Sequence, residues 1–251
     1  MRTIFSAALG VTIAAVIALV PFSAQASGQY ATGSTGIDNS YPSCHDKKIP
    51  VAGKAFGIVG VNGGSNYTQN PCAKALASMF NSTQPVSLYV NTGLYTGGNY
   101  FAQAMRDGNC GSNLSCGAYR HGYNAGVYAY NYAKSQGLGV TPTRWWLDVE
   151  ETNTWNADLA LNTDSIRGEY QALSERISAG STIGIYAVTS QWNLIVGSNW
   201  NRDVDRYPVW AADGLSSASK VASYCTGYSI TGGPIEIVQY VVSKQDYDQG
   251  C

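Results

Sequence analysis

The sequence has 251 residues, of which 12% are charged, and its 15 basic and 16 acidic residues give a formal net charge of −1. This balance excludes the basic surface of a nucleic-acid-binding protein, so we expect no nucleic-acid partner. Beyond the N-terminal region, no segment approaches the roughly 18 consecutive apolar residues of a membrane-spanning helix, so we expect no membrane partner.

The first 26 residues predict a secretory signal peptide. Arg2 precedes an apolar stretch at about residues 7–20, and Ala24-Gln25-Ala26 has the small residues of a cleavage site. Cleavage after Ala26 leaves 251 minus 26, or 225, residues. This length favours one domain over residues 27–251, which we expect to be soluble, secreted, extracellular and monomeric.

Short apolar segments rich in β-branched and aromatic residues follow along the chain. Segments of this kind, bounded by glycine, proline and polar residues, are typical of β-strands. Strands are predicted at residues 36–40, 55–61, 86–92, 144–150, 183–188, 207–212 and 235–241, with a further one around 221–227.

Helical patterns separate several of these strands. The clearest covers residues 162–180, where apolar residues recur at helical spacing and Gly180 can end the helix. Its candidate N-caps are Asn162, Thr163 and Asp164. Residues 71–80 and 118–137 are predicted to be helical as well. Alternating strands and helices predict an α/β protein with a (β/α) TIM-like barrel. We expect this barrel to be incomplete or irregular in its C-terminal third, where helical patterns weaken.

The segment RWWLDVE, residues 144–150, places carboxylates at the end of an apolar strand. Because side chains alternate along a strand, Asp148 and Glu150 face the same way. They stand at the carboxyl end of the strand, where barrel enzymes build their active sites. Glu151 is out of phase and is expected to face solvent or to bind a loop.

Six cysteines lie beyond the signal peptide, and an even number in an exported chain favours disulfides. Six cysteines allow 15 pairings. Proximity in sequence favours pairs of Cys44 with Cys72, Cys110 with Cys116, and Cys225 with Cys251. The spacing does not match a zinc site, and we expect no metal and no cofactor. His45 and His121, the two histidines, are predicted to be surface or structural residues rather than catalytic bases.

The chain resembles glycoside hydrolase family 25, the secreted lysozymes that cut peptidoglycan between N-acetylmuramic acid and N-acetylglucosamine. WWLDVE resembles the Asp-x-Glu strand of that family, and GIDNS resembles its opening strand. The other matches, in chain order, are FGIVGVNGGSNYTQNP, IGIYAVTSQWN, YPVWAAD and IVQYVVSKQDYDQG. Together they cover about residues 36 to 248, and they imply a disulfide-tied, divergent barrel of this family.

The resemblance implies a catalytic apparatus made of carboxyl groups. Glu150 is expected to be the acid/base, and Asp148 is expected to stabilise the oxazolinium that forms when the acetamido group of the substrate attacks. Asp38 and one of two C-terminal residues, Asp246 or Asp248, complete the set. Asp246 is preferred because it lies closer to the preceding strand. Charges so close together raise a pKa, as a proton donor requires.

Several aromatic and amide side chains are candidate walls of a glycan site, because sugar rings pack on aromatic faces. Trp145 is a weaker candidate, since a buried strand needs large apolar residues in any case. The sequence departs from the family at VNGGSNY and LYVNTG, so Asn62, Asn91 and Thr92 are expected to replace substrate-contacting groups. The other candidate substrate-binding residues are Tyr186, Trp210, Tyr240, Gln239 and Trp155.

Two alternatives to a glycosidase remain open from the sequence. In one, the barrel is a catalytically inactive carbohydrate-binding or envelope-associated domain. In the other, Asp148 and Glu150 cap the following helix, and the protein is a secreted structural module. A serine esterase and a phosphate-loop protein are disfavoured, because the chain has neither Gly-x-Ser-x-Gly nor a helix-opening Gly-Lys-Ser/Thr.

Overall fold

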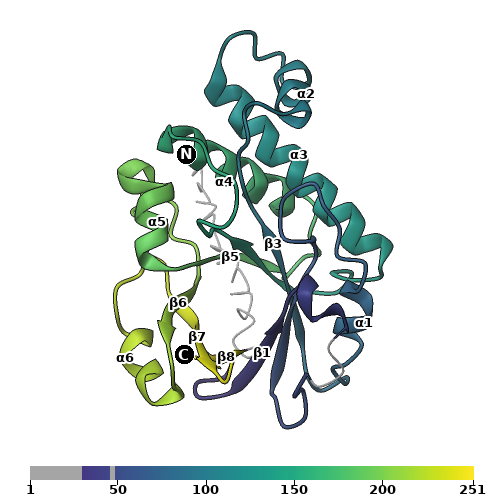
Figure 1. Cartoon of the computed structure of the whole chain (residues 1–251), viewed down its shortest axis with the longest axis vertical. Coiled ribbons are helices and arrows are strands. Elements are labelled where there is room, and N and C mark those ends of the chain that lie inside the picture. The colour runs from purple at the N-terminus through teal and green to yellow at the C-terminus, as the bar shows by residue number, and fades with distance from the viewer. Residues whose placement is uncertain (1–29, 46–48) are drawn as a thin grey trace, which may run out of the picture.

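The computed structural model describes residues 30–45 and 49–251, so the predicted signal peptide lies outside the described residues. Eight strands close a barrel in the order of the sequence, with helices around it (Figure 1). The strands are β1 (Thr35–Asn39), β2 (Phe56–Gly60), β3 (Val86–Asn91), β4 (Arg144–Asp148), β5 (Thr182–Ala187), β6 (Val209–Leu215), β7 (Ile235–Val242) and β8 (Gln245–Gly250).

Helices connect most of the parallel strands. Figure 1 shows α5 and α6 on one side of the strands, α1 on the other, and α2 at the far end of α3. The α-helices are α1 (Ala73–Ala77), α2 (Asn99–Asp107), α3 (Leu114–Ser135), α4 (Leu159–Ser174), α5 (Thr189–Ile195) and α6 (Val221–Cys225), and the 3-10 helices are η1 (Tyr41–His45), η2 (Gly197–Asn199) and η3 (Ala218–Lys220). None of the helices in the described part of the chain is both long and apolar enough to cross a membrane.

The barrel is irregular at its C-terminal end, as predicted. Strands β1 to β7 pair in parallel, whereas β8 runs antiparallel to both β7 and β1 and closes the barrel. A tight turn joins β7 to β8, with Ser243 at φ 53° and Lys244 at φ 66°. The predicted strands end at residue 241, so β8 was missed from the sequence.

Two further expectations are corrected by the structure. Residues 221–225 form α6 rather than a strand, because Val221, Tyr224 and Cys225 contact the core at helical spacing. Helix α4 begins at Leu159, where Asp158 caps it by accepting a hydrogen bond from the Ala160 amide at 3.0 Å. The predicted caps, Asn162, Thr163 and Asp164, lie inside the helix.

Side chains alternate between the barrel interior and the layer under the helices. Trp146 packs inside with Phe56, Ile58 and Trp210, while its neighbour Trp145 packs outside in the larger core. Both tryptophans are fully buried. This alternation directs Asp148 inward, in phase with Trp146.

The three predicted disulfides are present. Cys44 pairs with Cys72, Cys110 with Cys116, and Cys225 with Cys251, with Cα separations of 5.4, 5.5 and 5.3 Å. The last bridge ties α6 to the residue that follows β8, so it holds the closing strand in place. The signal in the sequence was proximity: each cysteine pairs with its neighbour along the chain.

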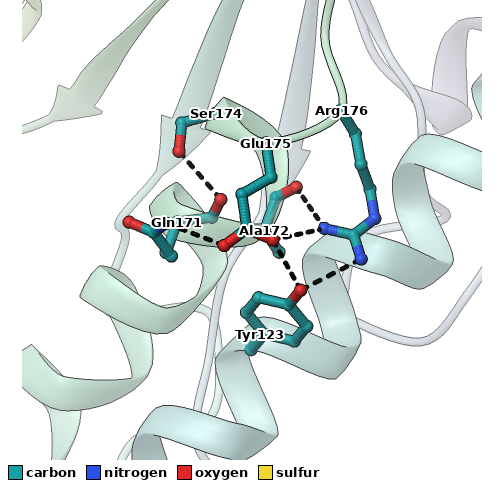
Figure 2. A network of polar contacts seen from close by, with 6 residues as sticks. All are labelled: Tyr123, Gln171, Ala172, Ser174, Glu175 and Arg176. Carbon is teal, nitrogen blue, oxygen red and sulfur yellow. Dashed lines mark hydrogen bonds and ion pairs between the residues drawn. The ribbon is translucent and has the colours of Figure 1, made fainter.

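Helices α3 and α4 approach closely enough for their backbones to touch. A Cβ added at Gly122 would lie 1.8 Å from the Ser165 carbonyl oxygen, and one at Gly168 would lie 1.9 Å from the Tyr119 carbonyl oxygen. At the end of α4, polar side chains join the two helices (Figure 2): the Tyr123 hydroxyl donates to Glu175 at 2.6 Å and accepts from Arg176 at 3.0 Å. Glycines in α3 and α4 therefore determine how α4, which follows β4, sits on the barrel.

Replacing Gly122 by alanine is expected to lower the free energy of unfolding by about 3 kcal/mol, because the new methyl group overlaps a backbone carbonyl that cannot rotate away. The gain of roughly 1 kcal/mol in helix propensity offsets only part of this cost. Urea unfolding followed by circular dichroism measures the change. Asn131→Ala, at an exposed site on the same helix, is the control and should be near neutral; an unchanged midpoint for Gly122→Ala would contradict the close packing.

Candidate active site

A polar pocket opens at the carboxyl ends of the parallel strands, the end where barrel enzymes carry their sites. Its volume is about 300 Å³. Four carboxyl groups reach it, and no basic side chain of the described residues lines it. The lining residues are Asp38, Ser40, Tyr89, Asp148, Glu150, Tyr186, Trp210, Gln239 and Asp246.

Asp148, the last residue of β4, is 4% exposed. Its Oδ2 accepts a hydrogen bond from the Asn91 side chain, while its Oδ1 has no partner among the described residues. Burial is the main cause that raises the pKa of Asp148 well above its usual value, followed by the charges of Glu150 and Asp38. One oxygen is thus held by the protein, and the other is buried without a partner beside the pocket that Asp148 lines.

Glu150 lies two residues further and is less buried. The Tyr186 hydroxyl lies 3.3 Å from its Oε1 and 3.1 Å from Gln239 Oε1, so these two acceptors compete for one proton. The pKa of Glu150 is raised, chiefly by burial; the Tyr186 hydrogen bond opposes this rise and the charge of Asp246 adds to it. A carboxyl group with a raised pKa keeps its proton closer to neutral pH, as a general acid must.

Asp38 reaches the pocket from β1 on the opposite wall. Gln239 Nε2 donates to its Oδ2 at 3.0 Å, which links residues 201 positions apart. The pKa of Asp38 is raised to about 7, first by burial and then by the charge of Asp246. Gln239 therefore connects Asp38 to Tyr186, and through Tyr186 to Glu150.

The two C-terminal aspartates both project from β8 toward the barrel interior, two residues apart. Because β8 runs antiparallel to the other strands, its first residues lie at the open end, and Asp246 lines the pocket. Asp248 is fully buried, paired with Gln239 and Gly36 in the strand register, and its pKa is raised well above normal, by burial and then by Asp38. Asp246 thus faces the pocket and Asp248 lies deeper.

Three of the predicted glycan-contacting residues line the pocket, namely Tyr186, Trp210 and Gln239, whereas Tyr240, Trp155, Asn62, Asn91 and Thr92 do not. Tyr240 points out of the barrel, because it follows the inward-facing Gln239, and its ring stacks on Tyr247 with centroids 5.6 Å apart. Trp155 is partly buried, and its indole nitrogen donates to the Glu150 carbonyl at 2.7 Å. It holds the backbone of Glu150 and forms no wall of the pocket.

The two predicted asparagines lie behind the pocket. The Asn62 side chain, 2% exposed, accepts a hydrogen bond from the Asn91 backbone amide at 2.9 Å and donates one to the Asn91 carbonyl at 3.0 Å. Asn91 in turn donates to Asp148. Asn62, which follows β2, and Asn91, which ends β3, therefore form a buried chain of amides that positions Asp148. Thr92 also supports this residue, because its hydroxyl donates to the Asp148 carbonyl at 2.8 Å.

Two lining residues, Ser40 and Tyr89, were missed from the sequence. Ser40 lies two positions after Asp38, and Tyr89 lies two positions before Asn91. The alternation that placed Asp148 and Glu150 on one face applies to both, so a signal was present. His121 is buried in α3 at 2% exposure, and Glu151 is exposed, as expected.

The carboxyl cluster predicts an unusual dependence of stability on pH. A carboxyl group whose pKa is higher in the folded than in the unfolded state stabilises the fold at low pH, and this contribution is lost as the pH rises through the folded pKa. The contribution of Asp38 is lost between its ordinary pKa of 3.8 and its folded pKa of about 7, and the last part of that loss falls between pH 6.5 and 8. His121, with a pKa lowered by burial from 6.5 to about 4, is neutral in the folded state over this range, and most of its effect on stability lies below pH 6.5.

We therefore expect the melting temperature to fall as the pH rises from 6.5 to 8. Thermal unfolding followed by circular dichroism across this range is the measurement. Asp38→Asn should flatten the slope, whereas Glu151→Gln, at an exposed neighbouring site, should leave it unchanged. A melting temperature that rises with pH over this interval would show that the acids are ionised and compensated in the folded protein.

Comparisons with known proteins agree with this architecture. A family model described as lysozyme-like protein 1 matches residues 112–224. Among solved structures, the CTP1L endolysin superposes with a TM-score of 0.53 at 14% identity, and a glycosyl hydrolase 25 of Streptococcus pneumoniae does so with 0.51 at 16%. The Cpl-1 endolysin, solved with a peptidoglycan analogue, gives 0.53 at 15%. No curated protein sequence matches the chain.

These superpositions cover 87% of this chain in each case. They cover 87% of the Streptococcus pneumoniae chain, but only 66% of the CTP1L endolysin and 54% of Cpl-1, less than two thirds of either endolysin. At these identities the likeness concerns the fold, and the predicted barrel type is confirmed. The chain therefore has the barrel fold of these endolysin and glycosyl hydrolase 25 structures, and its residues 112–224 match the lysozyme-like family model.

Proposed function

We propose that the protein is a glycoside hydrolase that cleaves the glycan backbone of peptidoglycan or of a related N-acetylated polysaccharide. The observation that carries this proposal is the convergence of Asp38, Asp148, Glu150 and Asp246 on one pocket. The pocket contains no compensating basic side chain among the described residues. Carboxyl groups arranged in this way suit the protonation of a glycosidic oxygen and the stabilisation of positive charge at an anomeric carbon.

In the proposed reaction, the Glu150 carboxyl group gives its proton to the glycosidic oxygen as the bond to the anomeric carbon breaks. The acetamido oxygen of the same sugar attacks that carbon and forms an oxazolinium ring. The Asp148 carboxylate, which lines the pocket, accepts the acetamido N–H and stabilises the positive charge, and this charge in turn lowers the raised pKa of Asp148. Water then opens the ring, and Glu150 recovers a proton from that water.

The remaining carboxyl groups have supporting roles in this proposal. Asp38 and Asp246 face Glu150 across the pocket, and the charge of Asp246 helps to raise the pKa of Glu150. Tyr186 and Trp210 supply the aromatic faces on which a pyranose ring packs. Secretion of residues 27–251 as a monomer is part of the same proposal, since the substrate lies outside the cell.

The direct experiment is to incubate residues 27–251 with purified peptidoglycan and to measure the release of reducing ends. Mass spectrometry of the products then identifies which sugar carries the new reducing end. Release of muropeptides with N-acetylmuramic acid at the reducing end supports a lysozyme-type cut. If a folded sample releases nothing yet sediments with insoluble peptidoglycan, the protein is the inactive carbohydrate-binding barrel.

A further inference from the structure

The segment that follows β3 is hydrogen-bonded to the segment that carries Asp148 and Glu150. The Thr92 amide donates to the Asp148 carbonyl at 3.0 Å, and the Leu94 amide donates to the Thr154 carbonyl at 2.7 Å. Two residues on, Thr96 Oγ1 accepts from the Asn156 side chain at 3.0 Å. Residues 92–96 therefore run beside residues 148–156 at the rim of the pocket end of the barrel.

Tyr95 lies between two of these fastened positions, and its side chain is 61% exposed. In Figure 1 the chain passes from β3 through this segment toward α2. Its neighbours Leu94 and Thr96 both bond to the 154–156 segment, which begins four residues after Glu150. The ring thus stands on a rigid part of the rim instead of on a free loop.

A pair of glycines holds the Tyr95 ring in place. A Cβ added at Gly97 would lie 2.9 Å from the Tyr95 hydroxyl oxygen, and one at Gly98 would lie 2.9 Å from its Cδ1. The ring therefore rests against the backbone of the Gly97–Gly98 pair and leaves its other surface to solvent. Any larger residue at either position would displace it.

An exposed aromatic ring contributes little to the free energy of folding, because most of its apolar area remains in contact with water. An ordered, exposed aromatic ring instead increases the affinity for a ligand, because binding then loses no conformational entropy in ordering that side chain. A ring at the rim of a glycan cleft meets the C–H face of a sugar. Hydrogen-bonding groups around it, including the Thr96 hydroxyl, suit a hydroxylated ligand.

We propose that Tyr95 is a stacking platform for a pyranose ring of the same glycan chain, outside the pocket in which the bond is cut. The inference rests on the proposed function and extends it, because it makes the protein selective for long glycan strands. Sugars in the carboxylate pocket bind independently of Tyr95. Only a chain that extends over the rim reaches its ring.

The experiment compares kcat/KM for polymeric peptidoglycan glycan with kcat/KM for the shortest N-acetylated oligosaccharide that the protein cleaves. Tyr95→Ala is expected to lower the value for the polymer by about tenfold, a typical loss for one aromatic contact, and to leave the value for the short substrate unchanged. Tyr95→Phe should behave as the unmodified protein, because the face of the ring is retained. Tyr119→Ala, which removes an exposed tyrosine from α3, is the matched control.

A second variant moves the ring without removing it. Gly98→Ala should displace Tyr95 and reproduce the loss on the polymer, while circular dichroism shows an unchanged fold. Equal losses on short and long substrates, or no loss on either, would overturn the platform. If the unmodified protein cleaves no substrate, the proposed hydrolase function is wrong. The role of Tyr95 is then tested by sedimentation with insoluble peptidoglycan. Tyr95→Ala must bind peptidoglycan more weakly than Tyr119→Ala does, or the proposed stacking platform is wrong as well.

Discussion

Replacing Glu150 by glutamine is expected to lower kcat for the release of reducing ends from peptidoglycan by about 10²- to 10⁴-fold, the usual contribution of a general acid. Glutamine keeps the shape of the side chain and the contact with Tyr186, but it cannot give a proton to the glycosidic oxygen. KM should change little, because the lost proton transfer belongs to the transition state. Initial rates over a range of substrate concentrations separate the two constants.

The chain offers a close control for this experiment. Glu151 is the next residue, is exposed and lies outside the pocket. Glu151→Gln removes the same charge one position away and should retain full activity. If both variants keep the parental rate, Glu150 is not the proton donor, and Asp38, with its pKa of about 7, becomes the candidate to test next.

Replacing Asp148 by asparagine is expected to lower kcat by about 10²- to 10³-fold, comparable to the loss of one group that stabilises charge in a transition state. Asparagine fits the same space but cannot ionise to the carboxylate that stabilises the oxazolinium. Asp148 is also almost completely buried, so the variant must be shown to unfold at the same urea concentration as the parent. Reducing-end assays then measure the loss of activity in the folded protein.

Two controls make the role of Asp148 specific. Asp203→Asn, at an exposed aspartate, should have no effect. De-N-acetylated peptidoglycan lacks the acetamido oxygen that attacks the anomeric carbon, so the parent should cleave it about as poorly as Asp148→Asn cleaves normal peptidoglycan. Efficient cleavage of the de-N-acetylated glycan would show that the acetamido group takes no part in the reaction.

Local features of the structure could be predicted from the sequence because they depend on residues that are close together in the chain. Alternation along β4 places Asp148 and Glu150 on one face, and the barrel type follows from the succession of strands and helices. Each disulfide joins cysteines adjacent in sequence order. These features need only the two-residue period of a strand, the helical period and short separations along the chain.

Strand β8 shows where sequence interpretation failed. A two-residue hairpin turn with positive φ at both positions usually carries asparagine and glycine, whereas this turn is Ser243-Lys244. The polar residues that follow resemble a tail, since four of the six residues of β8 are polar or charged. Pairing with β1, more than 200 residues earlier, makes them a strand, and no local pattern encodes that pairing.

The sequence by itself determined the class of fold, the paired cysteines and the face shared by Asp148 and Glu150, because each follows from residues close together in the chain. Only the tertiary structure decided that Gln239 bonds to Asp38, that Asp246 faces the pocket while Asp248 lies beneath it, and that Asn62, Asn91 and Trp155 position carboxyl groups. The physical reason is barrel closure. The register in which distant strands pair selects the side chains that meet, and that register is a property of the whole molecule.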